Sequence, residues 1–171
     1  MSRDFPDWVH PDKAAAARRE FSGTVPVDRM QRLKDLIVDQ EHTEVRFRLT
    51  FSHDEQRQVR VEVWIAGMVP MQCQRTLRTF MQSIEGTSVV GVVESEQAAD
   101  GLPDDYEPKL CVDNRLPLQE LIEEEILLSL PLVPLDPESE QVSEATESPG
   151  QETHRPFEVL AALKEKKRDQ D

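Results

Sequence analysis

The chain of 171 residues is long enough for one domain of ordinary size with tails, and too short for two full domains unless both are small. Hydrophobic residues make up 37% and charged residues 32%, so a core is possible while a good part of the chain stays solvated. The formal net charge of −14 argues against a protein that wraps nucleic acid, because an acidic surface repels phosphates.

The charge is concentrated in the second half of the chain. Residues 1–90 carry 13 Lys and Arg against 13 Asp and Glu, whereas residues 91–171 carry 7 against 21. A basic partner is therefore the simpler expectation. The sequence has neither an apolar run long enough to span a membrane nor a secretory signal, so we expect a cytoplasmic protein with no membrane partner. Its two cysteines, Cys73 and Cys111, are expected to stay thiols.

The N-terminal third predicts short elements. Residues 12–19 (DKAAAARR) read as a helix with Asp12 as a possible N-cap, and residues 20–25 as a brief strand. Residues 27–38 are predicted to form a helix, since apolar residues recur there at helical spacing: Met30, Leu33, Leu36 and Ile37.

The next region changes to the two-residue period of strands. Residues 45–51 and 59–65 alternate apolar and polar side chains around a polar turn, which predicts an antiparallel hairpin. Gly67 is expected to break the run before a third strand at 68–75, where Pro70 favours an edge or a bulge. Two further β-prone runs flank Gly86, at 78–84 and 87–94.

A long acidic connection and an amphipathic helix follow. Residues 95–115 are polar and contain helix breakers. Residues 117–129 are predicted to form a helix with an apolar stripe made of Leu118, Leu121, Ile122, Ile126 and Leu128. Glu125 falls within that stripe, and we expect it to reach solvent from the stripe's edge, with a buried functional carboxylate as the alternative.

The C-terminal residues divide into two segments. Residues 136–154 are rich in Ser, Glu, Pro and Thr, which predicts a disordered acidic linker. Residues 156–167 are predicted to form an amphipathic helix with Phe157 and Leu160 on its apolar face. We therefore expect an α+β core domain over 1–135, a linker over 136–154 and a docking helix over 155–171. The core would be an antiparallel β-sheet of four to six strands with flanking helices.

Catalytic and metal-binding motifs are weak. The cysteines and histidines lack the spacing of a zinc site, and neither a nucleophile elbow nor a phosphate-binding glycine loop is visible. We expect no enzyme, no cofactor, no metal and no small-molecule substrate. Four arginines of the hairpin, joined by Arg75 and Arg78, could contact phosphates: Arg46, Arg48, Arg57 and Arg60. An ordinary solvated sheet face is the favoured interpretation, because acids are interleaved with them: Glu44, Asp54, Glu55 and Glu62.

Several segments resemble a known family. They are F-S-G-x-V-P at 21–26 with R-L at 32–33, M-Q-C-Q-R at 71–75, L-P-x-x-Y-E-P at 102–108, L-I-E-E-E-I-L-L-S-L-P-L-V-P at 121–134, and P-F-x-V-L-A-x-L-K at 156–164. In this order they resemble the bacterial YceD family of large ribosomal RNA subunit accumulation proteins. The resemblance implies a non-catalytic role in large-subunit assembly, without a molecular mechanism.

The chain departs from the family pattern at one point. Many members carry C-Q-R-C and a later histidine and cysteine, which look like a metal site. Here Thr76 replaces the second cysteine and residues 136–141 (DPESEQ) contain neither ligand, so the resemblance implies no metal role for Cys73.

Two binding hypotheses follow. In the first, an acidic surface engages a basic ribosomal protein or a large-subunit assembly factor, anchored by Phe157 and Leu160; the acids are Asp104, Asp105, Glu107, Glu120, Glu123 and Glu124. In the alternative, ribosomal RNA is bound directly by the arginine-rich face of the hairpin, through Arg46, Arg48, Arg60 and Arg75.

Overall fold

The structure is a computed structural model that describes residues 5–139. Residues Met1–Asp136 form one compact unit, and all of the architecture below belongs to it. The predicted helix at 156–167 and most of the predicted linker lie outside the described residues.

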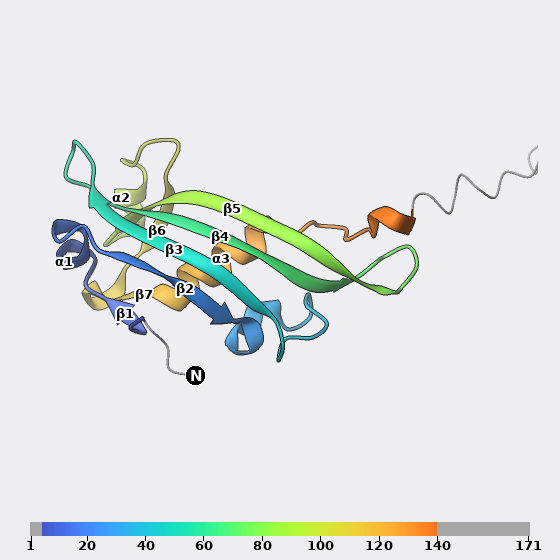
Figure 1. Cartoon of the computed structure of the whole chain (residues 1–171). Helices are drawn as coiled ribbons and strands as arrows, with labels where there is room; N and C mark the ends of the chain where they lie inside the picture. The colour runs from blue at the N-terminus through green and yellow to red at the C-terminus, as the bar shows by residue number, and fades with distance from the viewer. Residues whose placement is uncertain (1–4, 140–171) are drawn as a thin grey trace, which may run out of the picture. The chain divides into compact units, whose positions relative to one another are not determined.

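The unit is built on a five-stranded sheet with the strand order β2-β3-β4-β5-β6 (Figure 1). The strands are β2 (Glu20–Pro26), β3 (Glu44–His53), β4 (Val59–Gln72), β5 (Thr79–Val93) and β6 (Glu107–Leu110). The α+β class, the strand number and the 45–51/59–65 hairpin are confirmed. The sheet is not wholly antiparallel, however, because β6 pairs parallel with β5. The acidic connection of residues 94–106 is long enough to return the chain for a parallel pairing.

Two predicted strand breaks were wrong. β4 continues through Gly67 and β5 through Gly86, so the predicted third strand at 68–75 is largely the second half of β4, and the runs at 78–84 and 87–94 are one strand. Each glycine keeps a partner in the ladder, Gly67 opposite Val45 and Ile84, and Gly86 opposite Ile65.

Pro70 lies in the part of β4 that extends beyond its pairing with β3, as the edge prediction required. Its carbonyl oxygen accepts the backbone N–H of Val38 at 2.9 Å on that side of the strand, rather than a bond from β3. The missing proline N–H therefore costs the ladder no bond to β5.

The predicted helix at 27–38 is instead two single 3₁₀ turns, η1 (Val27–Arg29) and η2 (Gln31–Leu33). Met30 between them has an extended backbone, with φ −89° and ψ 97°. Met30, Leu33 and Ile37 are buried as the pattern predicted, but Leu36 is 41% exposed. The prediction that most of these apolar residues are buried was therefore correct. The segment connects β2 with β3 through two short turns and not through a continuous helix.

The N-terminal residues pack against the start of the longest helix. α1 (Pro11–Ala16) begins after His10 with Pro11 in its first turn, so Asp12 is not the N-cap. β1 (Trp8–Val9) pairs with β7 (Leu116–Pro117) in a small second sheet that sequence reasoning missed. The 95–115 connection also contains α2 (Glu96–Ala99) and a 3₁₀ turn, η3 (Val112–Asn114).

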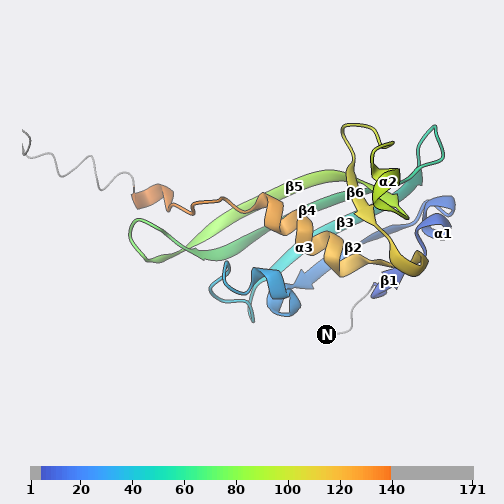
Figure 2. The same ribbon diagram turned by 180° about the vertical axis from the view of Figure 1, so that it is seen from behind.

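The longest helix, α3 (Leu118–Ser129), confirms the prediction at 117–129. It crosses one face of the sheet, over β4 and β5 (Figure 2). Four of the five stripe residues are buried there, Leu118, Leu121, Ile122 and Ile126, whereas Leu128 is 65% exposed. Seen from the other side, the middle of the sheet stands in front of α3 (Figure 1). Over residues 5–139, no helix is long and apolar enough to cross a membrane.

Candidate functional site

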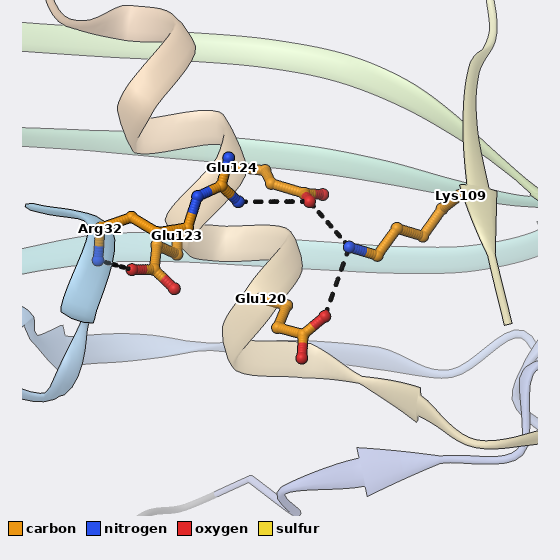
Figure 3. A network of polar contacts seen from close by, with 5 residues as sticks. All are labelled: Arg32, Lys109, Glu120, Glu123 and Glu124. Carbon is orange, nitrogen blue, oxygen red and sulfur yellow. Dashed lines mark hydrogen bonds and ion pairs between the residues drawn. The ribbon is translucent and has the colours of Figure 1, made fainter. Parts of the chain in front are cut away.

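The exposed side of α3 carries acids that are already paired within the molecule (Figure 3). The Lys109 Nζ lies 2.8 Å from the Glu124 Oε1 and 3.4 Å from the Glu120 Oε2. The Arg32 Nη1 lies 3.4 Å from the same Glu124 oxygen. Lys109 comes from β6 and Arg32 from η2, so the two cations tie neighbouring elements to the helix.

Glu123 faces the interior rather than the surface. Its side chain is buried at 7% exposure, and its Oε1 accepts the backbone N–H of Arg32 at 2.8 Å (Figure 3). An N–H at the start of a helical turn has no acceptor within the turn, so the Glu123 carboxylate supplies the acceptor that the Arg32 N–H of η2 needs. Of the three acids predicted on this helix, Glu120 and Glu124 reach solvent and Glu123 has a structural contact.

Glu125 is also buried, which makes the solvent-reaching interpretation wrong. It is 5% exposed and its carboxylate accepts a hydrogen bond from the Ser88 hydroxyl of β5. Gly86 makes the room for it, because a Cβ built there would lie 2.3 Å from the Glu125 Oε1 and 2.2 Å from the Ser129 Oγ. Burial raises the pKa of the Glu125 carboxyl above its ordinary value, although the Ser88 hydrogen bond acts in the opposite direction.

The connection between β5 and β6, together with the first residue of β6, carries a run of acids that have no cation partner among residues 5–139. We call these six residues the acidic loop, and all six are exposed: Glu94, Glu96, Asp100, Asp104, Asp105 and Glu107. Within residues 5–139 no Lys, Arg or His forms an ion pair with any of them. The predicted residues Asp104, Asp105 and Glu107 therefore belong to the same exposed stretch of chain as three further acids that the prediction did not include.

The acidic loop is anchored to the sheet by two side chains. Leu102 and Tyr106 lie over Gly91 of β5, where an added Cβ would come within 2.8 Å of Leu102 and 3.1 Å of Tyr106. The Tyr106 hydroxyl also donates to Asp54 Oδ2 at 3.3 Å, at the turn between β3 and β4. The backbone that carries these carboxylates is therefore held against the sheet at Leu102 and Tyr106.

Two of the four predicted RNA-binding arginines lie beside Trp64 on the face of the sheet opposite α3. The guanidinium carbons of Arg46 and Arg48 lie 5.9 and 5.6 Å from the ring centre of Trp64. Arg48 stands directly opposite Trp64 in the β3–β4 ladder. The sequence did not identify Trp64 as a site residue. Its alternation with Val63 and Ile65 indicates an outward position, but only the register of β3 with β4 places it beside the arginines.

The other two predicted arginines lie elsewhere. Arg60 is on the same face but pairs with Glu62 and lies 6.0 Å over the Tyr106 ring. Arg75 belongs to the turn between β4 and β5. The structure thus separates the predicted stripe into one pair beside Trp64 and two distant members.

Cys73 does not have the surroundings of a metal ligand. Its side chain is fully buried and its Sγ accepts the backbone N–H of Asp136 at 3.3 Å. That hydrogen bond, followed by one from the Thr76 side chain, lowers the pKa of the Cys73 thiol to about 6. Structural zinc sites take four ligands from Cys and His side chains, and the threonine that stands where the second cysteine would be is not such a ligand. No three metal-ligating side chains meet anywhere in residues 5–139, so the residues present do not fit a metal.

A groove beside the end of α3 exposes apolar side chains. It is lined by the segment after η2 and the proline-bounded segment after the helix, including Leu36, Val38, Leu132 and Val133. Leu132 is fully exposed and Val133 is 60% exposed. Such a surface is typical of proteins that contact another polypeptide. The predicted anchors Phe157 and Leu160 lie outside the described residues.

Comparison with known proteins places the chain in a family. The model of the family described as "Large ribosomal RNA subunit accumulation protein YceD" matches residues 61–164, more than half of the chain. A protein of that name from Haemophilus influenzae is 29% identical over 169 residues, which cover 94% of this chain and 97% of that protein. No solved structure matches significantly. The chain therefore belongs to the YceD family, which is linked to the accumulation of large-subunit ribosomal RNA.

Proposed function

We propose that the protein is a non-catalytic factor in biogenesis of the large ribosomal subunit, and that it binds a basic protein through the acidic loop. The observation that carries this proposal is the set of six exposed carboxylates for which residues 5–139 supply no ion pair. The family supplies the process, since its name links it to the accumulation of large-subunit ribosomal RNA.

The chemistry of the loop favours a cationic protein as its partner. Like charges held on an anchored loop repel one another, and a partner that brings Lys and Arg relieves that repulsion. Proteins that bind ribosomal RNA carry such residues because they neutralise phosphates. A ribosomal protein or a large-subunit assembly factor therefore has the charge that the loop attracts, and complementary charge accelerates the encounter.

Two acids of α3 extend the same surface in a weaker form. Glu120 and Glu124 keep side-chain exposures of 57% and 37% while they pair with Lys109. A partner must compete with that lysine for them, whereas Asp104, Asp105 and Glu107 have no such competitor among residues 5–139. Glu123 is omitted from the proposed contact because it is buried against η2. Phe157 and Leu160 stay in the proposal as apolar anchors.

The test uses charge reversal at matched surfaces. The full chain is immobilised and offered the proteins extracted from purified large subunits, and each captured protein is then purified and its affinity measured. We expect the variant with Asp104, Asp105 and Glu107 all changed to Lys to lose at least about tenfold in affinity, because the complementary charges become repulsive. The control changes Asp28, Asp35 and Glu41 to Lys, which alters the net charge equally at exposed positions elsewhere.

An equal loss of affinity in the loop variant and the control variant would mean that net charge alone is responsible for binding, and it would refute a contact specific to the acidic loop. Capture that the loop variant leaves unchanged would refute the acidic loop itself. A Phe157→Ala and Leu160→Ala variant, measured against the same purified partner, tests the proposed anchors separately.

A further inference from the structure

The sheet face opposite α3 contains a row of outward side chains in which an aromatic ring lies beside arginines and hydroxyl groups. In register across four strands, Ser22 of β2 is opposite Arg48 of β3, Arg48 is opposite Trp64 of β4, and Trp64 is opposite Thr87 of β5. The indole therefore stands between a guanidinium and a small hydroxyl side chain. Arg46 is two residues along β3 from Arg48 and lies on the same face, so the ring has arginines at two positions.

This row combines the two contacts that a nucleotide requires. A partly exposed aromatic ring can stack on any base, because every base has a π-face, and the guanidinium groups can bind phosphate through paired hydrogen bonds. Trp64 is only partly buried, and the exposed hydroxyls of Thr87, opposite it, and of Ser22, on the far side of Arg48, can donate hydrogen bonds. Sheet faces that bind single-stranded RNA use aromatic residues in this way.

The acids on the same face limit how much nucleic acid it can hold. Glu20 lies 3.9 Å from Arg48, and Glu44, Glu62 and Glu85 also stand at outward positions of the strands. A long phosphate track would meet these carboxylates. A duplex does not fit this face either, because its bases are stacked on one another and Trp64 cannot reach them.

The geometry points to a site for one or two nucleotides of single-stranded RNA, with a base stacked on Trp64 and the flanking phosphates bound by Arg46 and Arg48. The site does not depend on the acidic loop, which lies between β5 and β6, so one molecule can hold a basic protein and an RNA segment on different surfaces. Such a protein would bring the two components of a ribosomal subunit together.

The experiment follows the fluorescence of Trp64 on titration with a short single-stranded RNA oligonucleotide. The chain has two tryptophans, so the full-length protein carries Trp8→Phe and all indole emission comes from Trp64. We expect quenching that saturates, and a logarithm of affinity that falls with the logarithm of salt at a slope of about −1.4, since two phosphates are contacted on a single strand. Trp64→Ala, measured by RNA anisotropy, should weaken binding roughly 5- to 150-fold because one stacked base is lost.

Matched variants separate the site from general effects. Arg46→Gln with Arg48→Gln should bring the salt slope close to zero, while Arg29→Ala, which removes an exposed arginine from η1, should leave affinity and slope unchanged. Trp64→Leu provides a second test should Trp64→Ala fail to fold. Duplex RNA, inorganic phosphate and a basic protein serve as competing probes, and none of them should quench Trp64.

Several outcomes would overturn the site. These are no quenching at about 50 mM salt, equal RNA affinity in the folded Trp64 variants, or quenching by a basic protein but not by RNA. The acidic-loop variant is the remaining control: it should bind RNA as the parent chain does or slightly better, so failure of this site and failure of the proposed protein contact can be told apart.

Discussion

The two faces of the five-stranded sheet carry the same alternating pattern but have opposite roles. On β3, Phe47 is 2% exposed and packs in the core, while the next residue, Arg48, has a side chain 58% exposed. The first face is covered by α3, and the second holds Trp64 beside two arginines of β3. The difference teaches that the covered side of these strands stabilises the fold while the open side is available for the proposed binding, so we expect substitutions on one side to leave the other intact.

The same contrast appears between two glutamates of α3. Glu125 is 5% exposed between the helix and β5, and its pKa is raised by burial. Glu120, one turn earlier, has a side chain 57% exposed and pairs with Lys109. Residue type is identical and the helix is the same, so the direction in which each position faces decides whether a carboxylate acts as a packed group or as a surface charge.

The largest effect is expected from truncating the covered face. Phe47→Ala should lower the free energy of unfolding by about 3–5 kcal/mol, because it removes a buried aromatic ring and leaves a cavity. Arg48→Ala, its neighbour on the open face, should change stability by less than about 0.5 kcal/mol. Urea unfolding followed by circular dichroism measures both. Similar losses in the two variants would show that the open face also supports the fold.

A smaller effect is expected where α3 approaches β5. Gly86→Ala should cost about 1–3 kcal/mol, since its Cβ would lie within 2.3 Å of Glu125 Oε1 and 2.2 Å of Ser129 Oγ. Gly23→Ala is the matched control, because its Cβ would meet Phe47 at 3.6 Å, an ordinary contact. The same unfolding assay applies. A neutral Gly86→Ala would mean that α3 stands further from the sheet.

The third prediction concerns the protonation of Glu125. Its pKa in the folded state lies above 4.5, so the folded protein holds this proton more tightly than the unfolded chain does. The corresponding stabilisation is present below the unfolded pKa and is lost as the pH rises through the folded pKa. Glu125→Gln, which cannot ionise, should therefore gain stability relative to the parent as the pH rises from about 4 to about 7, since the parent must ionise a buried carboxyl over that range.

The control for that series is Glu120→Gln on the exposed side of the same helix. Its stability difference from the parent should change less over the same pH range, because its side chain is 57% exposed whereas Glu125 is buried. Parallel pH profiles for the two variants would contradict the assignment of Glu125 as the buried group.

The smallest effect is expected from the polar contacts of Figure 3. Lys109→Gln should cost about 1 kcal/mol or less, because its two carboxylate partners are partly exposed and water screens the pairs. The loss should shrink as salt is added. Lys13→Gln, at an exposed position on α1, serves as the comparison and should be neutral. A loss that salt does not reduce would indicate that Lys109 acts through packing of its methylene groups.

The sequence by itself determined the class of fold, the hairpin and the long amphipathic helix, because apolar periodicity reports directly which side of an element is buried. It also suggested Asp104, Asp105 and Glu107 as candidates, since they belong to the half of the chain in which acids outnumber bases by 21 to 7. Periodicity does not report whether buried residues lie on one helix or on two turns, and so residues 27–38 were assigned incorrectly.

Tertiary structure alone decided the features that depend on pairing between distant segments. The register of β3 with β4 brought Arg48 opposite Trp64, the return of the chain made β6 parallel, and the approach of α3 to Gly86 buried Glu125. Each of these joins residues well separated in sequence. Local propensity cannot fix such contacts, because many registers satisfy the same alternating pattern and packing selects one of them.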